Sequence, residues 1–183
     1  MGRSAPARRF ARTPAGRSGG VAAQLWLLRH GEAEPHDAAP DPDRRLTERG
    51  EAQSRDAGRA LAALGITFGL VFTSPKVRAR ETAVLACEAL GNEPVVHPPL
   101  GAGLDTHEAL ALAAAGGAEG RTLLVGHEPD LSQVVHELTG ARAQFKKGGI
   151  AGMSLRNTTR GELLVLLRPR ELRVLGDRYG TAS

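Results

Sequence analysis

The sequence predicts an α/β fold, a three-layer sandwich in which helices cover both faces of a mostly parallel central sheet. Short apolar runs of strand length alternate with longer segments whose apolar residues recur every three or four positions. The apolar residues are mainly Ala and Leu, with few aromatics, which suits helices packed closely on a sheet. This alternation is typical of strand–helix–strand units with right-handed crossovers.

The first predicted strand is the apolar run at residues 24–29. A polar loop follows, and then a helix between Thr47, a suitable N-cap, and Gly65, a suitable C-terminal stop. The apolar residues of this helix recur at helical spacing, namely Ala57, Ala60, Leu61 and Leu64.

A second strand is predicted in "GLVFTSP", residues 69–75. Ser74 is expected to cap a second helix that Pro75 opens and Gly91 ends. Residues 94–98, "PVVHP", predict a short third strand.

Predicted helices and strands also alternate in the second half of the sequence. A weaker helix is predicted over residues 106–115, and "RTLLVGH", residues 121–127, predicts another strand. That strand leads into a helix that Pro129 opens and Gly140 ends, with apolar residues at positions i, i+3, i+4 and i+7.

Two final strands, 150–155 and 162–168, are expected to form a hairpin. The length of 183 residues indicates one domain, which we place at residues 24–183. Residues 1–23 contain five arginines and no acid, and we expect them to be a disordered tail outside the fold.

The net charge of +4 belongs to this tail. Of 24 basic residues, the five tail arginines leave 19, against 20 acidic residues. A domain without excess positive charge argues against nucleic-acid binding. Cys87 is the single cysteine, which excludes a disulfide framework, and no apolar run reaches the length of a membrane span. We expect a cytoplasmic protein, although an Arg-rich, acid-free start is also compatible with organelle import.

Polar residues gather where three predicted elements meet. The first strand ends in Arg29 and His30, the helix after the second strand carries Arg78, and a later strand ends at His127. Carboxyl ends of parallel strands share one edge of a sheet, where ligands bind. Two guanidiniums match the oxygens of a phosphoryl group, and a neutral imidazole can attack phosphorus. The four residues therefore predict a phosphate site that needs no metal and no other cofactor.

Three segments, "LLRHGEAE", "TSPKVRARETA" and "LLVGHEPDLS", resemble the signatures of the histidine phosphatase superfamily. The short chain, "LTERG" and "FKKGGIAGM" resemble its SixA-like phosphohistidine phosphatase branch in particular. The resemblance implies a phosphoglycerate mutase-like fold. It also implies that His30 is the phosphate-accepting nucleophile, while Arg29, Arg78 and His127 bind the phosphoryl group. Arg80 is the competitor for the role of Arg78.

The sequence departs from the mutase members of the superfamily. Ala33 and His36 stand where the mutases have Ser and Asn, and Ala102 stands at the place of their proton-donating Glu. A positioned acid speeds ester cleavage by roughly 10²–10⁴-fold, whereas an imidazole leaving group needs it far less. Glu128 and, more weakly, Glu34 are possible substitute acids.

The favoured hypothesis is a metal-independent phosphatase that acts on protein phosphohistidine through a covalent intermediate on His30. One alternative is a phosphatase of small phosphate esters with the same fold. Another is a non-catalytic module that binds phosphorylated ligands. Such a module would be expected to lack His30 or one of the arginines, and the sequence retains all of them. The expected partner is thus a phosphohistidine-bearing protein or a small phosphorylated substrate, with no nucleic acid and no membrane. Lys146 and Lys147 are candidates to attract such anions.

Overall fold

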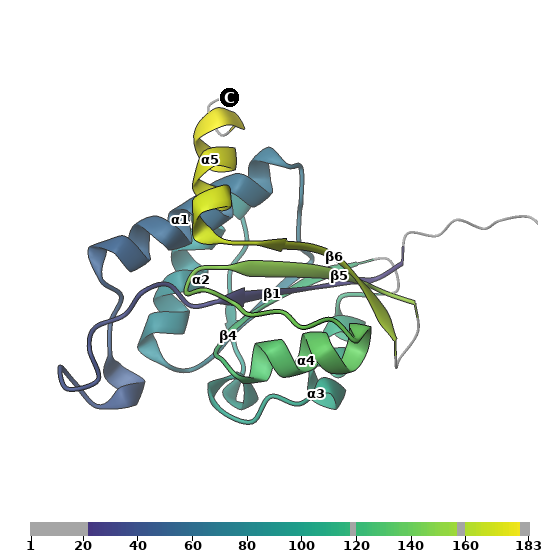
Figure 1. Ribbon diagram of the computed structural model, residues 1–183, viewed down its shortest axis with the longest axis horizontal. Helices are drawn as coiled ribbons and strands as arrows, with labels where there is room; N and C mark the ends of the chain where they lie inside the picture. The colour runs from purple at the N-terminus through teal and green to yellow at the C-terminus, as the bar shows by residue number, and fades with distance from the viewer. Residues whose placement is uncertain (1–21, 118–119, 157–159, 180–183) are drawn as a thin grey trace, which may run out of the picture.

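A mixed β-sheet forms the centre of the protein (Figure 1). The computed structural model describes residues 22–117, 120–156 and 160–179, and within these ranges the sheet has six strands in the order β3-β2-β4-β1-β5-β6. Strands β1 to β4 run parallel, β5 pairs antiparallel with β1, and β6 pairs antiparallel with β5. The strands are β1 (Gln24–Arg29), β2 (Leu70–Thr73), β3 (Val95–Val96), β4 (Arg121–Gly126), β5 (Ile150–Leu155) and β6 (Gly161–Leu167).

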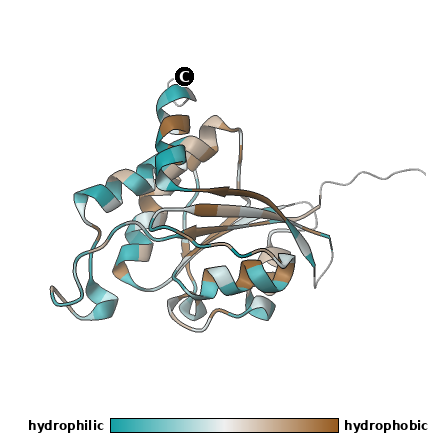
Figure 2. Ribbon diagram, viewed as in Figure 1, coloured by the Kyte–Doolittle hydropathy of each residue, from teal (hydrophilic) through white to brown (hydrophobic). Residues whose placement is uncertain are grey.

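Helices cover both faces of this sheet, so the predicted three-layer α/β fold is confirmed. Helices α1 (Glu48–Ala63), α2 (Val77–Leu90) and α5 (Pro169–Tyr179) share one apolar core with the sheet. Helices α3 (Thr106–Ala115) and α4 (Asp130–Thr139) share the other. The side chains of β1 alternate between the two cores, as the period of a strand requires. Figure 2 shows apolar residues concentrated in the strands and hydrophilic residues along the helices.

Most predicted helix ends are confirmed. The Thr47 hydroxyl accepts the N–H of Gly50 and caps α1, while Gly91 and Gly140 adopt positive φ at the ends of α2 and α4. Glycine alone takes this left-handed conformation without steric cost. Leu64 differs from the prediction, because it follows the last helical residue and is largely exposed rather than packed.

Helix α2 begins at Val77, two residues later than predicted. The Ser74 hydroxyl accepts the N–H of Lys76 at 3.1 Å, and so it closes the turn before the helix rather than capping the helix itself. Pro75 lies in that turn. This shift keeps the buried Ser74 at the end of β2, beside the rim of the sheet.

Helix α5 was not predicted, because its apolar signal is short: only Leu172 is fully buried, and Gly176 interrupts the pattern. Two 3₁₀ turns, at Asp41–Asp43 and Pro98–Gly101, were also missed. The antiparallel pairing of β5 with β6 bears out the predicted pair of strands, although the middle of their connection lies outside the described residues. Most of the predicted N-terminal tail, residues 1–21, also lies outside them.

Candidate active site

The four residues predicted to bind phosphate meet in one pocket of about 290 Å³ at the carboxyl edge of the sheet. Strands β1 and β4 pair side by side with Arg29 opposite Gly126, so the residues that follow each strand emerge together. Strand β2 pairs with β4, and helix α2, which follows β2 in the chain, brings Arg78 to the same place. The described residues that line the pocket are Arg29, His30, His36, Asp41, Arg44, Lys76, Arg78, His127, Glu128 and Lys147.

His30 presents an unprotonated Nε2 to this pocket. Its Nδ1 lies 2.7 Å from the carbonyl oxygen of Gly31, which accepts only from N–H, so the proton must sit on Nδ1. The Nε of Arg78 lies 3.4 Å from Nε2 and donates to it, which requires a lone pair there. Burial lowers the pKa of His30 to about 3, with further lowering by His127 and Arg78. His30 is therefore a neutral imidazole at physiological pH, with the free nitrogen that nucleophilic attack on phosphorus needs.

The two arginines are held rigidly by backbone oxygens. Arg29 donates from Nη1 to the carbonyl of Phe145 at 2.7 Å, and Arg78 donates from Nη1 to the carbonyl of Asp41 at 2.5 Å. Burial lowers the pKa of both groups, but a guanidinium stays charged in proteins. The Nε of Arg29 is buried and has no hydrogen-bond partner among the described residues.

His127 stands beside the nucleophile, with the two ring centroids 5.0 Å apart. Its Nε2 lies 2.8 Å from the hydroxyl of Ser74, which already accepts the N–H of Lys76 and can direct its own hydrogen to Nε2. Its Nδ1 is buried and has no hydrogen-bond partner among the described residues. Burial lowers the pKa of His127 to about 3, with help from nearby Arg78 and Lys76. With its proton on Nδ1, His127 would have one hydrogen bond to donate to a phosphoryl oxygen.

Gly31 is required by packing against α1. A Cβ at this position would lie 2.5 Å from the carbonyl oxygen of Gly50, and a Cβ on Gly50 would lie 1.9 Å from the carbonyl oxygen of Glu32. The N–H of Gly31 donates to the buried hydroxyl of Thr82 at 3.0 Å. The glycine after His30 therefore lets the backbone lie against α1.

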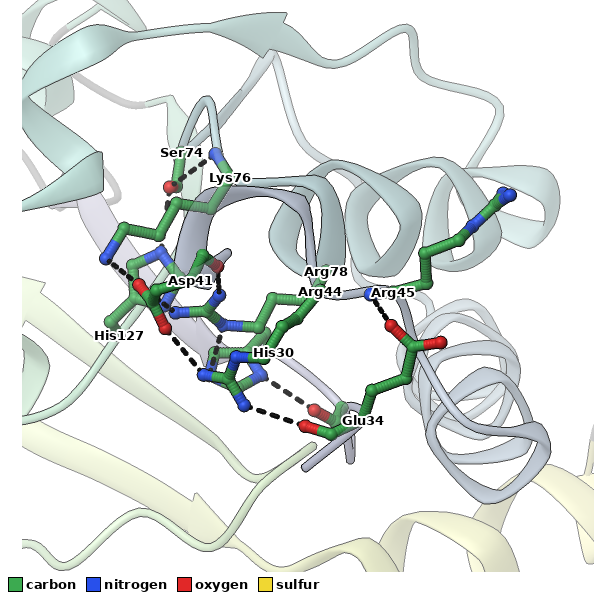
Figure 3. Close-up of polar contacts among 10 residues, drawn as sticks. His30, Glu34, Asp41, Arg44, Arg45, Ser74, Lys76, Arg78 and His127 are labelled. Carbon is green, nitrogen blue, oxygen red and sulfur yellow. Dashed lines mark hydrogen bonds and ion pairs between the residues drawn. The ribbon is translucent and has the colours of Figure 1, made fainter. Parts of the chain in front are cut away.

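The carboxylates proposed as acids are engaged elsewhere. The Ser132 hydroxyl lies 2.6 Å from both oxygens of Glu128 and donates its one hydrogen to this carboxylate, and Oε1 also accepts the N–H of Phe145, although Glu128 does line the pocket. Glu34 accepts the N–H of Arg45 and is not among the described residues that line the pocket. Figure 3 shows its side chain turned toward Arg45 and away from the histidines.

The sequence analysis missed a cluster around Asp41 at the pocket rim. The Asp41 carboxylate accepts from Arg44 at 2.7 Å, from Lys76 at 2.9 Å and from Arg78 at 3.3 Å (Figure 3). Hydrogen bonds from Lys76 and Arg44 hold the pKa of this carboxyl well below its usual range. Asp41 lies in a 3₁₀ turn of a Pro- and Asp-rich loop, which has the composition of an ordinary surface loop and so gave no signal.

Two remaining candidates are now placed. Arg80 is exposed and lines a separate groove of about 770 Å³ on the outer side of α2, so Arg78 is the arginine that reaches the histidines. Lys147 lines the pocket that contains His30 and His127, whereas Lys146 is exposed and is not among its described lining residues.

Two wider features concern the part of the chain that the structure describes. No group of three or more His, Cys, Asp or Glu side chains there is arranged to hold a metal ion. None of the helices there combines the length and apolar character that crossing a bilayer requires.

Comparison with known proteins agrees with this fold. Residues 25–101 match the histidine phosphatase superfamily (branch 1). An uncharacterized protein of Picosynechococcus is 34% identical over 166 residues, which cover 81% of this chain and 98% of that protein. A 2,3-bisphosphoglycerate-dependent phosphoglycerate mutase of Methylobacterium is 47% identical over 72 residues, which are 37% of this chain and only 34% of the mutase.

Among solved structures, the protein histidine phosphatase SixA complexed with tungstate superposes with a TM-score of 0.73. It is 28% identical, and the match covers 81% of this chain and 99% of SixA. The chain belongs to the histidine phosphatase superfamily, as its fold and its paired histidines and arginines indicate. Within that superfamily its structural neighbours include SixA phosphohistidine phosphatases.

Proposed function

We propose that this protein is a metal-independent phosphatase that cleaves the P–N bond of protein phosphohistidine, through a covalent phosphoryl intermediate on His30. The observation that carries the proposal is the fixed tautomer of His30. Its Nδ1 donates to Gly31 and its Nε2 lone pair faces the guanidinium of Arg78. No proton has to be removed before attack.

The chemistry then proceeds in two balanced steps. Nε2 of His30 forms a bond to phosphorus while the P–N bond to the leaving imidazole breaks, and that nitrogen takes a proton from solvent. Arg29, Arg78 and the Nδ1–H of His127 bind the equatorial oxygens and stabilise their charge. Water next attacks the phosphoryl group on His30, inorganic phosphate leaves, and the neutral imidazole is restored.

The carboxylates of the pocket favour a leaving group that needs no protein acid. Asp41 has a lowered pKa and is ionised at neutral pH, and the oxygens of Glu128 accept hydrogen bonds from Ser132 and Phe145. Asp41 therefore offers no proton, and both oxygens of Glu128 lie in hydrogen-bond contact with Ser132. An alkoxide leaving group would lose the roughly 10²–10⁴-fold that a positioned acid contributes, whereas an imidazole is a weak enough base to leave without it. The similarity to SixA, a protein histidine phosphatase, supports the same substrate class.

Substrate preference tests this proposal. We expect kcat/KM for a phosphohistidine peptide to exceed that for sugar phosphates or phosphoglycerate by at least the roughly 10²-fold attributed to a missing acid. His30→Ala should abolish turnover of both. His136→Ala is the matched control, because this histidine is exposed on α4 and is not among the described residues lining the pocket.

The runner-up is a phosphatase of small phosphate esters, which the 72-residue similarity to a phosphoglycerate mutase favours. Faster turnover of the esters than of the phosphohistidine peptide would decide for it. A protein that binds phosphate yet turns over neither substrate would instead be a phospho-ligand binding module.

A further inference from the structure

The carboxylate of Asp41 occupies a cationic site of its own, next to the phosphoryl site. Arg44 and Lys76 each donate a hydrogen bond to it, and neither side chain is hydrogen-bonded to His30 or His127 in the described structure. Arg78 joins the two sites, since its Nη2 lies 3.3 Å from Asp41 and its Nε lies 3.4 Å from Nε2 of His30. The guanidinium of Arg78 would therefore lie between an anion bound in this second site and a phosphoryl group bound at His30.

Arg44 is a buried and fixed component of this second site. Its side chain is only 7% exposed and lines the pocket, and its Nε is buried with no hydrogen-bond partner among the described residues. Its Nη1 is fixed by the carbonyl of Glu34 at 2.8 Å. A buried guanidinium is costly unless its donors are satisfied. The Nε of Arg44 is such an unsatisfied donor, so Asp41 and the carbonyl of Glu34 do not use the full donor capacity of this side chain.

Asp41 itself is easily displaced. Its side chain is 44% exposed, and the adjoining residues Pro40, Pro42 and Asp43 are exposed as well. Turning only the Asp41 side chain outward would free one donor each on Arg44, Lys76 and Arg78, while the carbonyl of Asp41 would still accept from Nη1 of Arg78. A partly exposed ion pair holds its partners only weakly.

We propose that Arg44 and Lys76 form a second anion subsite, which takes a carboxylate of the substrate after displacing Asp41. A carboxylate is inferred because the group that fills the subsite in the free protein is a carboxylate, bound by the same donors. The inference uses the proposed function only to place the phosphoryl group at His30. Two sources of the carboxylate fit: an acidic residue beside the phosphohistidine of a protein, or the carboxylate of a small phosphorylated acid.

Calorimetric titration tests the subsite without any turnover. The probes are 3-phosphonopropionate, which has a phosphonate and a carboxylate, and propylphosphonate, which has a methyl group in place of the carboxylate. We expect the intact protein to bind the first more tightly. Lys76→Met should reduce that preference about three- to fivefold, the scale of a partly exposed charge pair. Lys146→Met, an exposed lysine outside the described pocket lining, is the control and should leave the preference unchanged.

The variant Asp41→Ala distinguishes two possible roles of Asp41. Its carboxylate is either displaced by the substrate or only positions Arg78. Removing a competitor should tighten 3-phosphonopropionate by about three- to fivefold, more than propylphosphonate. Equal binding of the two probes by the intact protein, or a preference that Lys76→Met leaves intact, would overturn the subsite. Weaker binding of both probes to Asp41→Ala would show that Asp41 only positions Arg78, and would also overturn it.

Kinetics then identify the source of the carboxylate. A higher kcat/KM for a phosphohistidine peptide with a neighbouring Asp than for the same peptide with Asn assigns the subsite to acidic protein segments. Preference for 3-phosphoglycerate over glycerol 3-phosphate assigns it to small acids. Absence of turnover of every substrate would refute the proposed function and leave the titration result standing on its own.

Discussion

Replacing Gly31 with Ala should damage both stability and catalysis, because it drives a methyl group into the backbone of α1. The new Cβ would lie 2.5 Å from the carbonyl oxygen of Gly50 and 3.0 Å from two further backbone atoms of that residue. Ordinary contact needs at least 3.4 Å, so the two segments must separate by about 0.9 Å. The separation also strains the hydrogen bond from the N–H of Gly31 to Thr82.

The substitution should change both the unfolding free energy and kcat/KM. Overpacking of this kind costs about 1–3 kcal/mol of unfolding free energy, and the loss of one buried hydrogen bond adds about 1 kcal/mol. Because His30 adjoins Gly31, a displacement of about 1 Å should lower kcat/KM by on the order of 10²-fold. Denaturant unfolding and steady-state kinetics on phosphoramidate measure the two effects.

Gly126→Ala is the matched control, since Gly126 precedes His127 as Gly31 follows His30. There the new Cβ would lie 3.4 Å from a methyl group of Leu131 and 3.6 Å from one of Leu100, which are ordinary contacts with flexible side chains. We expect a cost below about 1 kcal/mol and a change in kcat/KM below about tenfold. Wild-type stability and activity in Gly31→Ala, or equal damage in the two variants, would refute the packing argument.

Three other perturbations follow from the buried groups. Thr82→Val removes the acceptor of the Gly31 N–H and should lower the unfolding free energy by about 1–3 kcal/mol in urea titrations; Thr139→Val, whose hydroxyl bonds partly exposed backbone, should cost less. Since burial lowers the pKa of His30 and His127 to about 3, the unfolded chain binds protons more tightly. Stability should therefore be full above pH 6.5 and fall on acidification by about 2 kcal/mol per histidine at pH 5. His127→Gln should flatten this dependence by about half, and an unchanged slope would contradict the assignment. Burial also raises the pKa of the Cys87 thiol to about 11, so thiol reagents should modify it only in denaturant.

Much of the fold was predictable because local signals agreed with the tertiary arrangement. The apolar run at β1, the cap at Thr47 and the glycine ends of α2 and α4 each report a local backbone requirement. Helix α5 escaped prediction because its position depends on contact with α1 rather than on its own apolar pattern. There a Cβ at Gly176 would meet the Cβ of Arg59 at 3.2 Å.

The site was predictable to the extent that it lies at strand ends. Arg29, His30 and His127 follow from the rule that parallel strands deliver ligand-binding residues to one edge. Asp41 and Arg44 come from a loop that meets Lys76 at the start of α2, and no sequence period encodes that approach. Glu128 resembled an acid by position, and only the contacts with Ser132 and Phe145 show where its oxygens point.

The most direct test of the account is rapid-quench mass spectrometry of the protein mixed with phosphoramidate. We predict that one phosphoryl group accumulates on the peptide containing His30, that it is labile in acid and stable in alkali, and that His30→Ala never acquires it. Turnover of phosphoramidate without any phosphorylated His30, or the phosphoryl group on His127 instead, would contradict the assignment of His30 as the nucleophile.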